Sequence, residues 1–352
     1  AYGHGAVPVA RAALSAGAVA LAVNEVQEGV ELRDGKLEVP VLLLTACLRE
    51  ELCAGIEANL TFSVSSRDEI LALADRARAI NQGSRRGIRT RVHLMVDTGM
   101  GRLGVPAGEG ARVVEILAGQ PQLELEGLYT HFAASEDFTS EQTQEQIACF
   151  ERVRTQFAER GLRPPLVHLA NTGGIVGRLE SWGTMVRPGS MLYGYLSFFT
   201  FAGAARTAEF YRQWPVRPAL ALKARIYSIR EFPAGAPVGY GARFRTTRTA
   251  RIGLLPVGYG HGWRRGLSGS PEASGRVIVR GRYAPLVGTI GMDLTHVDLT
   301  EIPGAQPGDE AILIGESGDA VIPPTEPARL LGTVPSEVLA GLSARIPRFY
   351  RD

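Results

Sequence analysis

The first 214 residues alternate short apolar runs, of the kind that form strands, with longer amphipathic segments of helical period. Strands separated by helices are joined by crossovers and therefore run parallel to one another. Eight such units close into a barrel that carries its chemistry at the carboxyl ends of the strands. Seven strand-like runs are visible, at residues 19–23, 40–45, 60–64, 90–96, 123–131, 166–169 and 185–193. The opening residues 1–16 have the pattern of a loop and helix that follow one more strand, so we predict an α/β barrel of the TIM type whose first strand lies upstream of Ala1.

Two of the intervening helices are marked by local sequence. Ser66-Arg67-Asp68-Glu69 has the spacing of a capping box, in which a hydroxyl and a carboxylate satisfy the first N–H groups of a helix. Residues 140–160 repeat apolar side chains at helical spacing and end at Gly161, a residue typical of helix C-termini. Both patterns predict helices between strands.

From about Pro215 the period of the apolar residues changes from helical to two. Alternation of this kind predicts strands with one buried face. The predicted strands cover residues 219–229, 249–255, 276–279, 286–290 and 310–314, and helical patterns return at 324–331 and 335–342. We therefore predict two domains, a barrel domain over 1–214 and a mostly-β domain over 215–352.

Composition and charge exclude several classes of protein. Hydrophobic residues make up 45% of the chain and the net charge is +2, which argues against intrinsic disorder and against a dedicated nucleic-acid binder. The longest apolar stretches fall far short of the ~20 residues that span a bilayer, so we expect no membrane segment. Cys47, Cys53 and Cys149 form no CxxC pair, so we expect free thiols in a cytoplasmic protein and no metal site.

One glycine motif raises the alternative of a nicotinamide-dependent dehydrogenase. Residues 99–104 read GMGRLG, which matches GxGxxG and follows a predicted strand. A dinucleotide fingerprint opens a helix directly and lies in the first strand–helix unit of its domain. Here Pro106 delays the helix until about Gly110, and three units precede the motif. Both departures argue against the dinucleotide site.

Polar residues follow four successive predicted strands, at the edge where a barrel builds its active site. They are Arg102, His131, the pair Asn171-Thr172, and the segment Arg187-Pro188-Gly189-Ser190. The hydroxyl groups and the glycine N–H groups of the last two loops are the usual equipment for a phosphate group. An arginine beside them would neutralise the phosphate or face the ring of a ligand. The sequence therefore predicts a site for a phosphorylated ligand.

The same loops, with several segments of the second domain, resemble alanine racemase. The matching segments run in order along the chain, at residues 1–5, 96–104, 130–132, 168–172, 186–189, 192–194, 239–241, 256–259, 291–293 and 345–350. The resemblance implies a barrel followed by a β domain, pyridoxal 5'-phosphate (PLP) as cofactor, and a head-to-tail homodimer with shared active sites. It also implies the interconversion of L- and D-alanine, which supplies D-alanine for peptidoglycan.

The chemistry that the resemblance implies needs a proton-transferring group on each face of the α-carbon. The α-proton of alanine is too weakly acidic for a side chain alone, and PLP makes it removable. In the family, one base is the lysine that holds PLP and the other is a tyrosine of the partner subunit, which matches Tyr240. A free tyrosine has a pKa near 10, so it needs cationic or hydrogen-bonding neighbours to act as a base. The resemblance implies that His131 and Arg187 supply them, that Arg265 supports Tyr240, and that Arg187 donates to the pyridine nitrogen.

The resemblance also assigns the remaining contacts. Arg102 would hold the phenolic oxygen of PLP and face the substrate. The residues implied around the cofactor and its phosphate are Tyr2, Asn171, Thr172, Gly189, Ser190 and Tyr350. Tyr259, Met292 and Asp293 of the partner subunit would shape the substrate entrance and bind the carboxylate of alanine.

Three features depart from the family pattern. The lysine that holds PLP stands three positions before the residue equivalent to Ala1, and neither Lys36 nor Lys223 matches its motif. The chain is therefore either an incomplete record of an active enzyme, which we expect because the break falls within one motif, or an inactive fragment. Met95 stands where many members carry a lysine that orients the equivalent of Arg102, and His261 stands where the family usually has an aspartate. A racemase of broader specificity and a decarboxylase on the same fold remain alternatives, although Arg187 argues against the decarboxylase.

Overall fold

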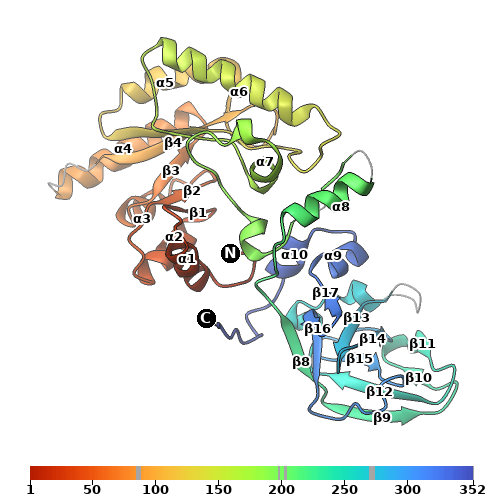
Figure 1. Ribbon diagram of the computed structural model, residues 1–352. Coiled ribbons are helices and arrows are strands. Elements are labelled where there is room, and N and C mark those ends of the chain that lie inside the picture. The colour runs from red at the N-terminus through yellow and green to blue at the C-terminus, as the bar shows by residue number, and fades with distance from the viewer. Residues whose placement is uncertain (85–88, 197–198, 202–203, 269–273, 352) are drawn as a thin grey trace. The chain divides into compact units, whose positions relative to one another are not determined.

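The computed structural model describes residues 1–84, 89–196, 199–201, 204–268 and 274–351. The chain divides into two compact units (Figure 1). The barrel unit consists of Ala6–Leu192 and Phe199–Pro215. The β unit consists of Ala1–Gly5, Tyr193–Phe198 and Val216–Asp352. The division of the chain into domains at 214/215 stays a prediction.

The barrel unit is built on a curled parallel sheet of seven strands. All of its strand pairings are parallel, and the strands follow one another across the sheet in chain order. They are β1 (Leu21–Val23), β2 (Val41–Leu43), β3 (Thr61–Val64), β4 (Thr90–Asp97), β6 (Leu123–Tyr129) and β7 (Leu166–His168), with the short β5 (Val105–Pro106) paired to β4. Six of the seven strands predicted for this half of the chain are confirmed, and so is the α/β-barrel class.

Helices join these strands, and their apolar faces pack on the sheet. In order they are α1 (Ala6–Ser15), α2 (Val26–Asp34), α3 (Leu52–Glu57), α4 (Arg67–Ser84), α5 (Gly110–Ala118), α6 (Gln142–Glu159), α7 (Thr172–Gly177) and α8 (Ala204–Gln213). On α4, the residues Ile70, Leu73 and Ala77 repeat at helical spacing and are at most 1% exposed. Figure 1 shows α4, α5 and α6 one after another along the outside of the sheet. The predicted helix start at Ser66 is confirmed, because the Ser66 hydroxyl accepts a hydrogen bond from the Glu69 N–H.

The strand predicted over residues 185–193 is wrong. The segment has no strand, and it ends in a 3-10 helix, η3 (Ser190–Tyr193). Pro188 has no N–H to give to a ladder, and the Gly189 N–H donates to the hydroxyl of Thr172. The Leu192 N–H then donates to the Gly189 carbonyl and closes a turn. The Arg187 N–H still donates to the Ala170 carbonyl, but from Gly189 onwards local bonds take the place of a ladder, so the apolar run 191–193 belongs to a turn.

The β unit is an antiparallel sheet of eight strands with two short helices. Its strand order is β17 (Ala320–Ile322), β16 (Glu310–Ser317), β13 (Arg276–Val279), β14 (Arg282–Val287), β15 (Thr295–Asp298), β12 (Ala250–Leu255) and β9 (Ser228–Phe232), and β8 (Leu222–Arg225) pairs with β16. A separate hairpin joins β10 (Pro237–Val238) to β11 (Phe244–Arg245), and the helices are α9 (Thr325–Leu331) and α10 (Pro335–Ala340). The predicted mostly-β character of this half is confirmed.

One predicted strand of the β unit is two strands. The run 219–229 breaks between β8 and β9, because the two pieces pair with different neighbours. At the break, the Ile226 N–H donates to the Asp309 carbonyl, and the Tyr227 N–H donates to the Leu254 carbonyl. The change of partner, which the alternation of apolar residues does not reveal, divides the strand.

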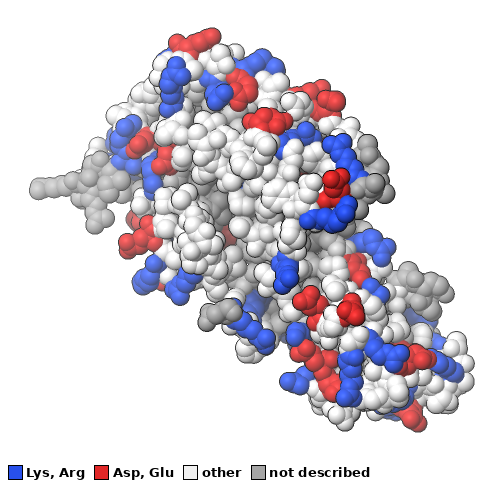
Figure 2. Space-filling view, viewed as in Figure 1, with Lys and Arg blue, Asp and Glu red and all other residues white. Residues whose placement is uncertain are grey.

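The surface carries charges of both signs. Figure 2 shows Lys and Arg side chains interspersed with Asp and Glu side chains on the face in view. Among the described residues, no helix has the length and apolar character needed to cross a bilayer.

Candidate active site

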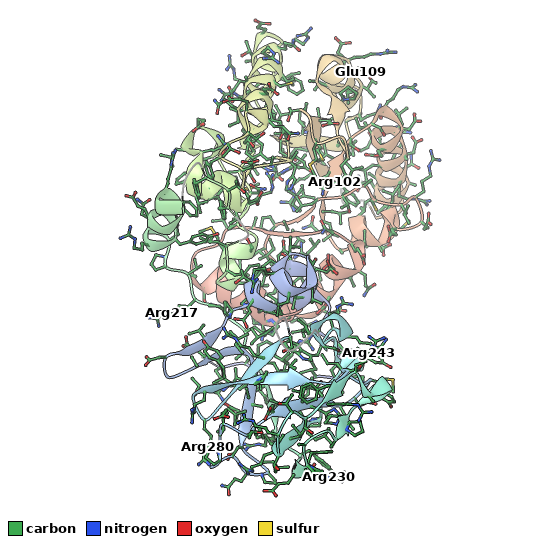
Figure 3. All side chains as sticks on the ribbon, turned by 90° about the vertical axis from the view of Figure 1, so that its right-hand side faces the viewer. Arg102, Glu109, Arg217, Arg230, Arg243 and Arg280 are labelled. Carbon is green, nitrogen blue, oxygen red and sulfur yellow. The ribbon has the colours of Figure 1, made fainter. Side chains whose placement is uncertain are left out.

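The loop after β4 is shaped by one carboxylate. Asp97 ends β4, and its Oδ1 accepts hydrogen bonds from the N–H groups of Gly99, Met100 and Gly101 at 2.9, 2.9 and 3.2 Å. Burial alone would raise the pKa of Asp97, but these three bonds lower it below its usual value. The loop then delivers Arg102, labelled in Figure 3, at the end of the strand. The glycine motif therefore forms a carboxylate-centred turn, and after a 3-10 helix, η1 (Ala107–Glu109), the next α-helix begins at Gly110, as predicted.

A buried amide on α6 ties this loop to the next one. Gln146 is 1% exposed, and its Nε2 donates to the Thr98 hydroxyl at 3.2 Å and to the His131 carbonyl at 3.0 Å. Its Oε1 accepts from the Ala133 N–H at 3.0 Å. Arg102 and His131 thus stand on loops that share one helix side chain.

Arg187 lies at the centre of the polar groups of the barrel unit. Its guanidinium donates to the backbone carbonyls of Thr130 at 2.9 Å, Leu169 at 3.1 Å and His168 at 3.1 Å. These carbonyls come from the ends of β6 and β7, so the strands themselves aim the side chain. Burial lowers the pKa of the guanidinium to about 10, which leaves it protonated at neutral pH.

His131 lies next to Arg187 and is kept neutral. The Arg187 Nη2 donates to its Nδ1 at 3.5 Å, so the remaining proton is on Nε2. Burial, followed by the charges of Arg187 and Arg102, lowers the pKa of His131 to about 4. The structure therefore brings together Arg102, His131 and Arg187, three residues that the sequence pointed to.

Behind Arg187 runs a chain of side chains that sequence reasoning missed. Arg187 Nη1 donates to His168 Nδ1, and His168 Nε2 lies 2.8 Å from His93 Nδ1. His93 Nε2 in turn lies 3.2 Å from Glu126 Oε2. His168 is fully buried, and burial, with the nearby charge of Arg187, lowers its pKa well below its usual value. A histidine inside an apolar strand run was the available signal, because a buried imidazole needs partners.

The start of α7 has the donors of a phosphate cradle. Asn171 is the N-cap, and its side chain accepts from the Gly174 N–H at 3.1 Å. The first turn of a helix presents N–H groups that the helix itself does not use. The Thr172 hydroxyl accepts from the Gly189 N–H at 3.1 Å, so the loop after β7 and the loop before η3 are joined. Thr172 and Ser190 are both buried.

Tyr240 stands exposed on a glycine turn of the β unit. Gly239 and Gly241 flank it at φ of 76° and 72°, where a side chain is strained. The Thr289 hydroxyl donates a hydrogen bond to the Tyr240 carbonyl at 3.1 Å and so stabilises the turn. A Cβ on Gly291 would lie 3.4 Å from the Tyr240 ring, so the ring rests on that backbone. Tyr240 is 73% exposed.

The predicted entrance residues gather beside Tyr240. Backbone bonds join their two loops: the Tyr259 N–H donates to the Gly291 carbonyl at 3.0 Å, and the Gly260 N–H donates to the Met292 carbonyl at 2.8 Å. Tyr259 and Met292 are half exposed. Asp293 pairs with Arg345 at 2.7 Å. The β unit therefore presents one surface that contains Tyr240, Tyr259, Met292 and Asp293.

Tyr2 and Tyr350 also belong to the β unit. The Tyr350 hydroxyl donates to the His4 carbonyl at 2.9 Å, and the Tyr2 ring packs edge-on against Tyr193 at 5.1 Å. Burial raises the pKa of Tyr2. Arg265 begins a short 3-10 helix, η6 (Arg265–Ser268), and is exposed. Its predicted support of Tyr240 stays a prediction.

Comparison with known proteins decides between the classes of enzyme. The family models described as "Alanine racemase, N-terminal domain" and "Alanine racemase, C-terminal domain" match residues 1–197 and 219–350. The chain belongs to the alanine racemase family. The family is one of isomerases that interconvert L- and D-alanine, so the predicted family and reaction are confirmed.

Individual alanine racemases match along nearly the whole chain. Alanine racemase of Desulforamulus reducens is 38% identical over 99% of this chain and 89% of its own length. Alanine racemase 2 of Caldanaerobacter subterraneus subsp. tengcongensis is 35% identical over 99% of this chain and 86% of its own length. The crystal structure of alanine racemase from E. faecalis has a TM-score of 0.86 at 29% identity, over 99% of this chain and 88% of that one. The alanine racemase family thus covers both units.

Proposed function

We propose that this chain racemises alanine with PLP bound at the strand ends of the barrel unit. The observation that carries the proposal is Arg187, which is held by three backbone carbonyls next to a neutral histidine. The donor set fits PLP: the first turn of α7 and the hydroxyls of Thr172 and Ser190 suit a phosphate, and Arg187 suits a ring nitrogen that accepts a hydrogen bond. When bound, PLP supplies the electron sink that makes the α-proton of alanine removable.

Arg187 would donate to the pyridine nitrogen without protonating it. A guanidinium is a donor at every N–H and gives up its proton only at high pH. Its pKa of about 10 keeps it charged at neutral pH in spite of burial. A ring nitrogen that stays unprotonated is a weaker electron sink, which discourages side reactions such as transamination. Arg102, from the loop after β4, would contact the phenolic oxygen of the cofactor.

Tyr240 would be the base on one face of the substrate and would come from a second copy of the chain. Its ring is exposed on a rigid turn, as expected of a group that acts outside its own subunit. The neutral His131 has its proton on Nε2, so it would donate to the phenolate oxygen of Tyr240 and stabilise that form. The positive charges of Arg187 and Arg102 act in the same direction. The active assembly would therefore be a homodimer with shared sites.

The roles of the other predicted residues follow from the resemblance to the family. Tyr2 and Tyr350, together with Asn171, Thr172, Gly189 and Ser190, would hold the phosphate group. Tyr259 and Met292 would line the entrance for alanine. The Arg345 guanidinium neutralises Asp293, so the carboxylate of the substrate would meet an ion pair there and not a lone negative charge. We also propose that the enzyme works in the cytoplasm, where D-alanine feeds peptidoglycan synthesis.

The decisive experiment replaces the phenol alone. In a chain extended upstream to include the lysine that holds PLP, Tyr240→Phe should lower L-to-D turnover by about 100-fold or more, because general base catalysis contributes about 10²–10⁴-fold. The absorbance of bound PLP should be unchanged, because Tyr240 is not among the residues proposed to hold the cofactor. Tyr227→Phe is a matched control: Tyr227 is equally exposed in the β unit and lies outside the predicted site. A turnover of Tyr240→Phe equal to that of the control would remove Tyr240 from the mechanism.

A further inference from the structure

The hydrogen-bonded side chains behind Arg187 have only one arrangement of protons, because Arg187 at one end can only donate and the Glu126 carboxylate at the other end can only accept. Arg187 can only donate, so His168 Nδ1 must accept and the proton of His168 is on Nε2. His168 then donates to His93 Nδ1, which leaves the proton of His93 on Nε2. The last acceptor is the carboxylate of Glu126, and an ionised carboxylate can only accept. Each bond therefore runs in the same direction, from Arg187 to Glu126.

The backbone of β6 is altered at the position that supplies this last acceptor. In the pairing of β4 with β6, Val92 lies opposite Leu125, but His93 lies opposite Gly127. Glu126 is the extra residue, and the ladder is out of step by one residue at that point. Bulges of this kind re-aim a side chain and are over-represented next to active sites. An unbroken ladder would pair His93 with Glu126 alone; with the bulge, both Glu126 and Gly127 lie opposite His93.

Gly127 makes room for the imidazole of His93. A Cβ on Gly127 would lie 2.5 Å from Cγ and Nδ1 of His93, closer than any real contact. The ring of His93 therefore lies directly against the backbone of the bulge. The bulge and the glycine together place the His93 imidazole between the two groups that it connects.

The charge of Glu126 is supported from its own surroundings. Arg91, on β4, lies 3.7 Å from Glu126 Oε1, while Oε2 faces His93. The hydrogen bond from His93 is the main reason that the pKa of Glu126 is lowered, and the charge of Arg91 adds to it. Glu126 is partly buried, with 22% of its side chain exposed, so one oxygen is engaged inside the sheet.

We propose that Glu126 is a positioning residue for Arg187: its carboxylate, on the extra residue of the bulge in β6, accepts from His93, stabilises the arrangement in which both histidines carry their proton on Nε2, and so holds the guanidinium in place. The arrangement of protons on the two histidines does not depend on bound PLP. Its consequence for catalysis rests on the proposed role of Arg187 at the PLP ring.

The first test measures the histidine tautomers directly by NMR, in the protein without PLP. The ¹⁵N shifts of the imidazole nitrogens distinguish a protonated nitrogen from an unprotonated one, and His93 and His168 should both be protonated on Nε2. Glu126→Leu removes the acceptor, so His93 should lose its single tautomer. Glu126→Gln keeps an acceptor oxygen and should restore it. If Glu126→Leu gives the wild-type histidine spectrum, the proposal is wrong.

Two further variants separate this effect from a general loss of structure. Glu124→Leu makes the same substitution on β6 at an exposed position and should leave the histidine spectrum unchanged. Glu126→Asp keeps the charge but draws the carboxylate back from His93 by about one methylene, so it should disturb the tautomers even if Glu126→Leu fails to fold. A wild-type spectrum for Glu126→Asp in that case would also overturn the proposal.

The second test measures the effect on catalysis, in the chain extended upstream and loaded with PLP. Glu126→Leu should lower kcat about 10- to 100-fold with little change in KM for alanine, because a misplacement of about 1 Å at a catalytic group costs up to ~10²-fold. Glu126→Gln should recover most of the loss. If the extended wild-type chain binds no PLP, the proposed function fails while the tautomer test still stands. If it racemises alanine and Glu126→Leu matches Glu124→Leu in kcat, the positioning role of Glu126 fails alone.

Discussion

At the scale of single residues, the site is defined by which groups can donate a hydrogen bond and which can accept one. Because Arg187 can only donate, the Nδ1 atoms of His131 and His168 must each accept a hydrogen bond from it. Both imidazoles must therefore stay neutral, and burial next to a cation achieves this. A neutral His131 is a donor with one free N–H, which is the state that suits a phenolate as its partner.

Because His131 stays neutral in the folded chain, the free energy of unfolding should fall measurably in acid. An unfolded histidine takes up a proton near pH 6.5, whereas the pKa of His131 in the folded chain is about 4. Between these values the unfolded state binds more protons, so the free energy of unfolding falls as the pH is lowered. We expect His131 to account for a loss of about 2 kcal/mol between pH 7 and pH 5. Urea unfolding at both values, for the wild type and for His131→Asn, measures it.

The difference between the two proteins isolates His131 from the other buried histidines. His168 has its pKa lowered in the same direction and weakens both proteins alike in acid. His131→Asn should therefore lose less stability than the wild type over this range. Equal losses would show that His131 is protonated at the same pH in the folded and unfolded chains.

The residues at the ends of strands were predictable, and those inside the strands were not. Arg102 and His131 lie where apolar runs end and a barrel exposes its loops; Arg187 was singled out with the segment 187–190, although the strand predicted over 185–193 included it. His93 and His168 lie within apolar runs, where pattern alone gives them no partner. Glu126 and Gly127 both lie opposite His93 because β6 carries one extra residue, and hydrophobic alternation carries no record of a bulge of that size.

At the scale of secondary structure, loops take their shape from side chains of neighbouring elements. The predicted strand over 185–193 failed for this reason, since Thr172 of α7 binds the backbone of Gly189. The loops after β4 and β6 are similarly governed by Gln146 of α6. Strand–helix alternation predicts the order of elements, but contacts between side chain and backbone decide where each loop goes.

Removal of the Gln146 amide should loosen both loops together. Gln146→Leu leaves the Ala133 N–H, the His131 carbonyl and the Thr98 hydroxyl without their partner. Since a buried polar group without a partner costs about 1–3 kcal/mol, we expect the free energy of unfolding to fall by about 3 kcal/mol. Gln156→Leu, an exposed position on the same helix, is the matched control. Urea unfolding followed by circular dichroism tests this, and equal midpoints for the two variants would refute it.

At the scale of the whole molecule, the predicted site residues divide between the two units. Arg102, His131 and Arg187 belong to the barrel unit, whereas Tyr240 and the entrance residues belong to the β unit. A head-to-tail homodimer would combine the barrel unit of one copy with the β unit of the other. Symmetric dimers with such reciprocal contacts are the commonest form of assembly.

Mixed dimers test this division directly, in the chain extended upstream. Tyr240→Phe lacks the phenol, and Arg187→Leu lacks the guanidinium, so each variant alone should be nearly inactive. If each site takes its tyrosine from the partner subunit, a mixed dimer has one site with both defects and one intact site. With random pairing, half of the dimers are mixed and half of their sites are intact, so co-expression should restore about a quarter of the wild-type turnover. If both groups came from one subunit, no site would be intact and the co-expressed chains would stay inactive.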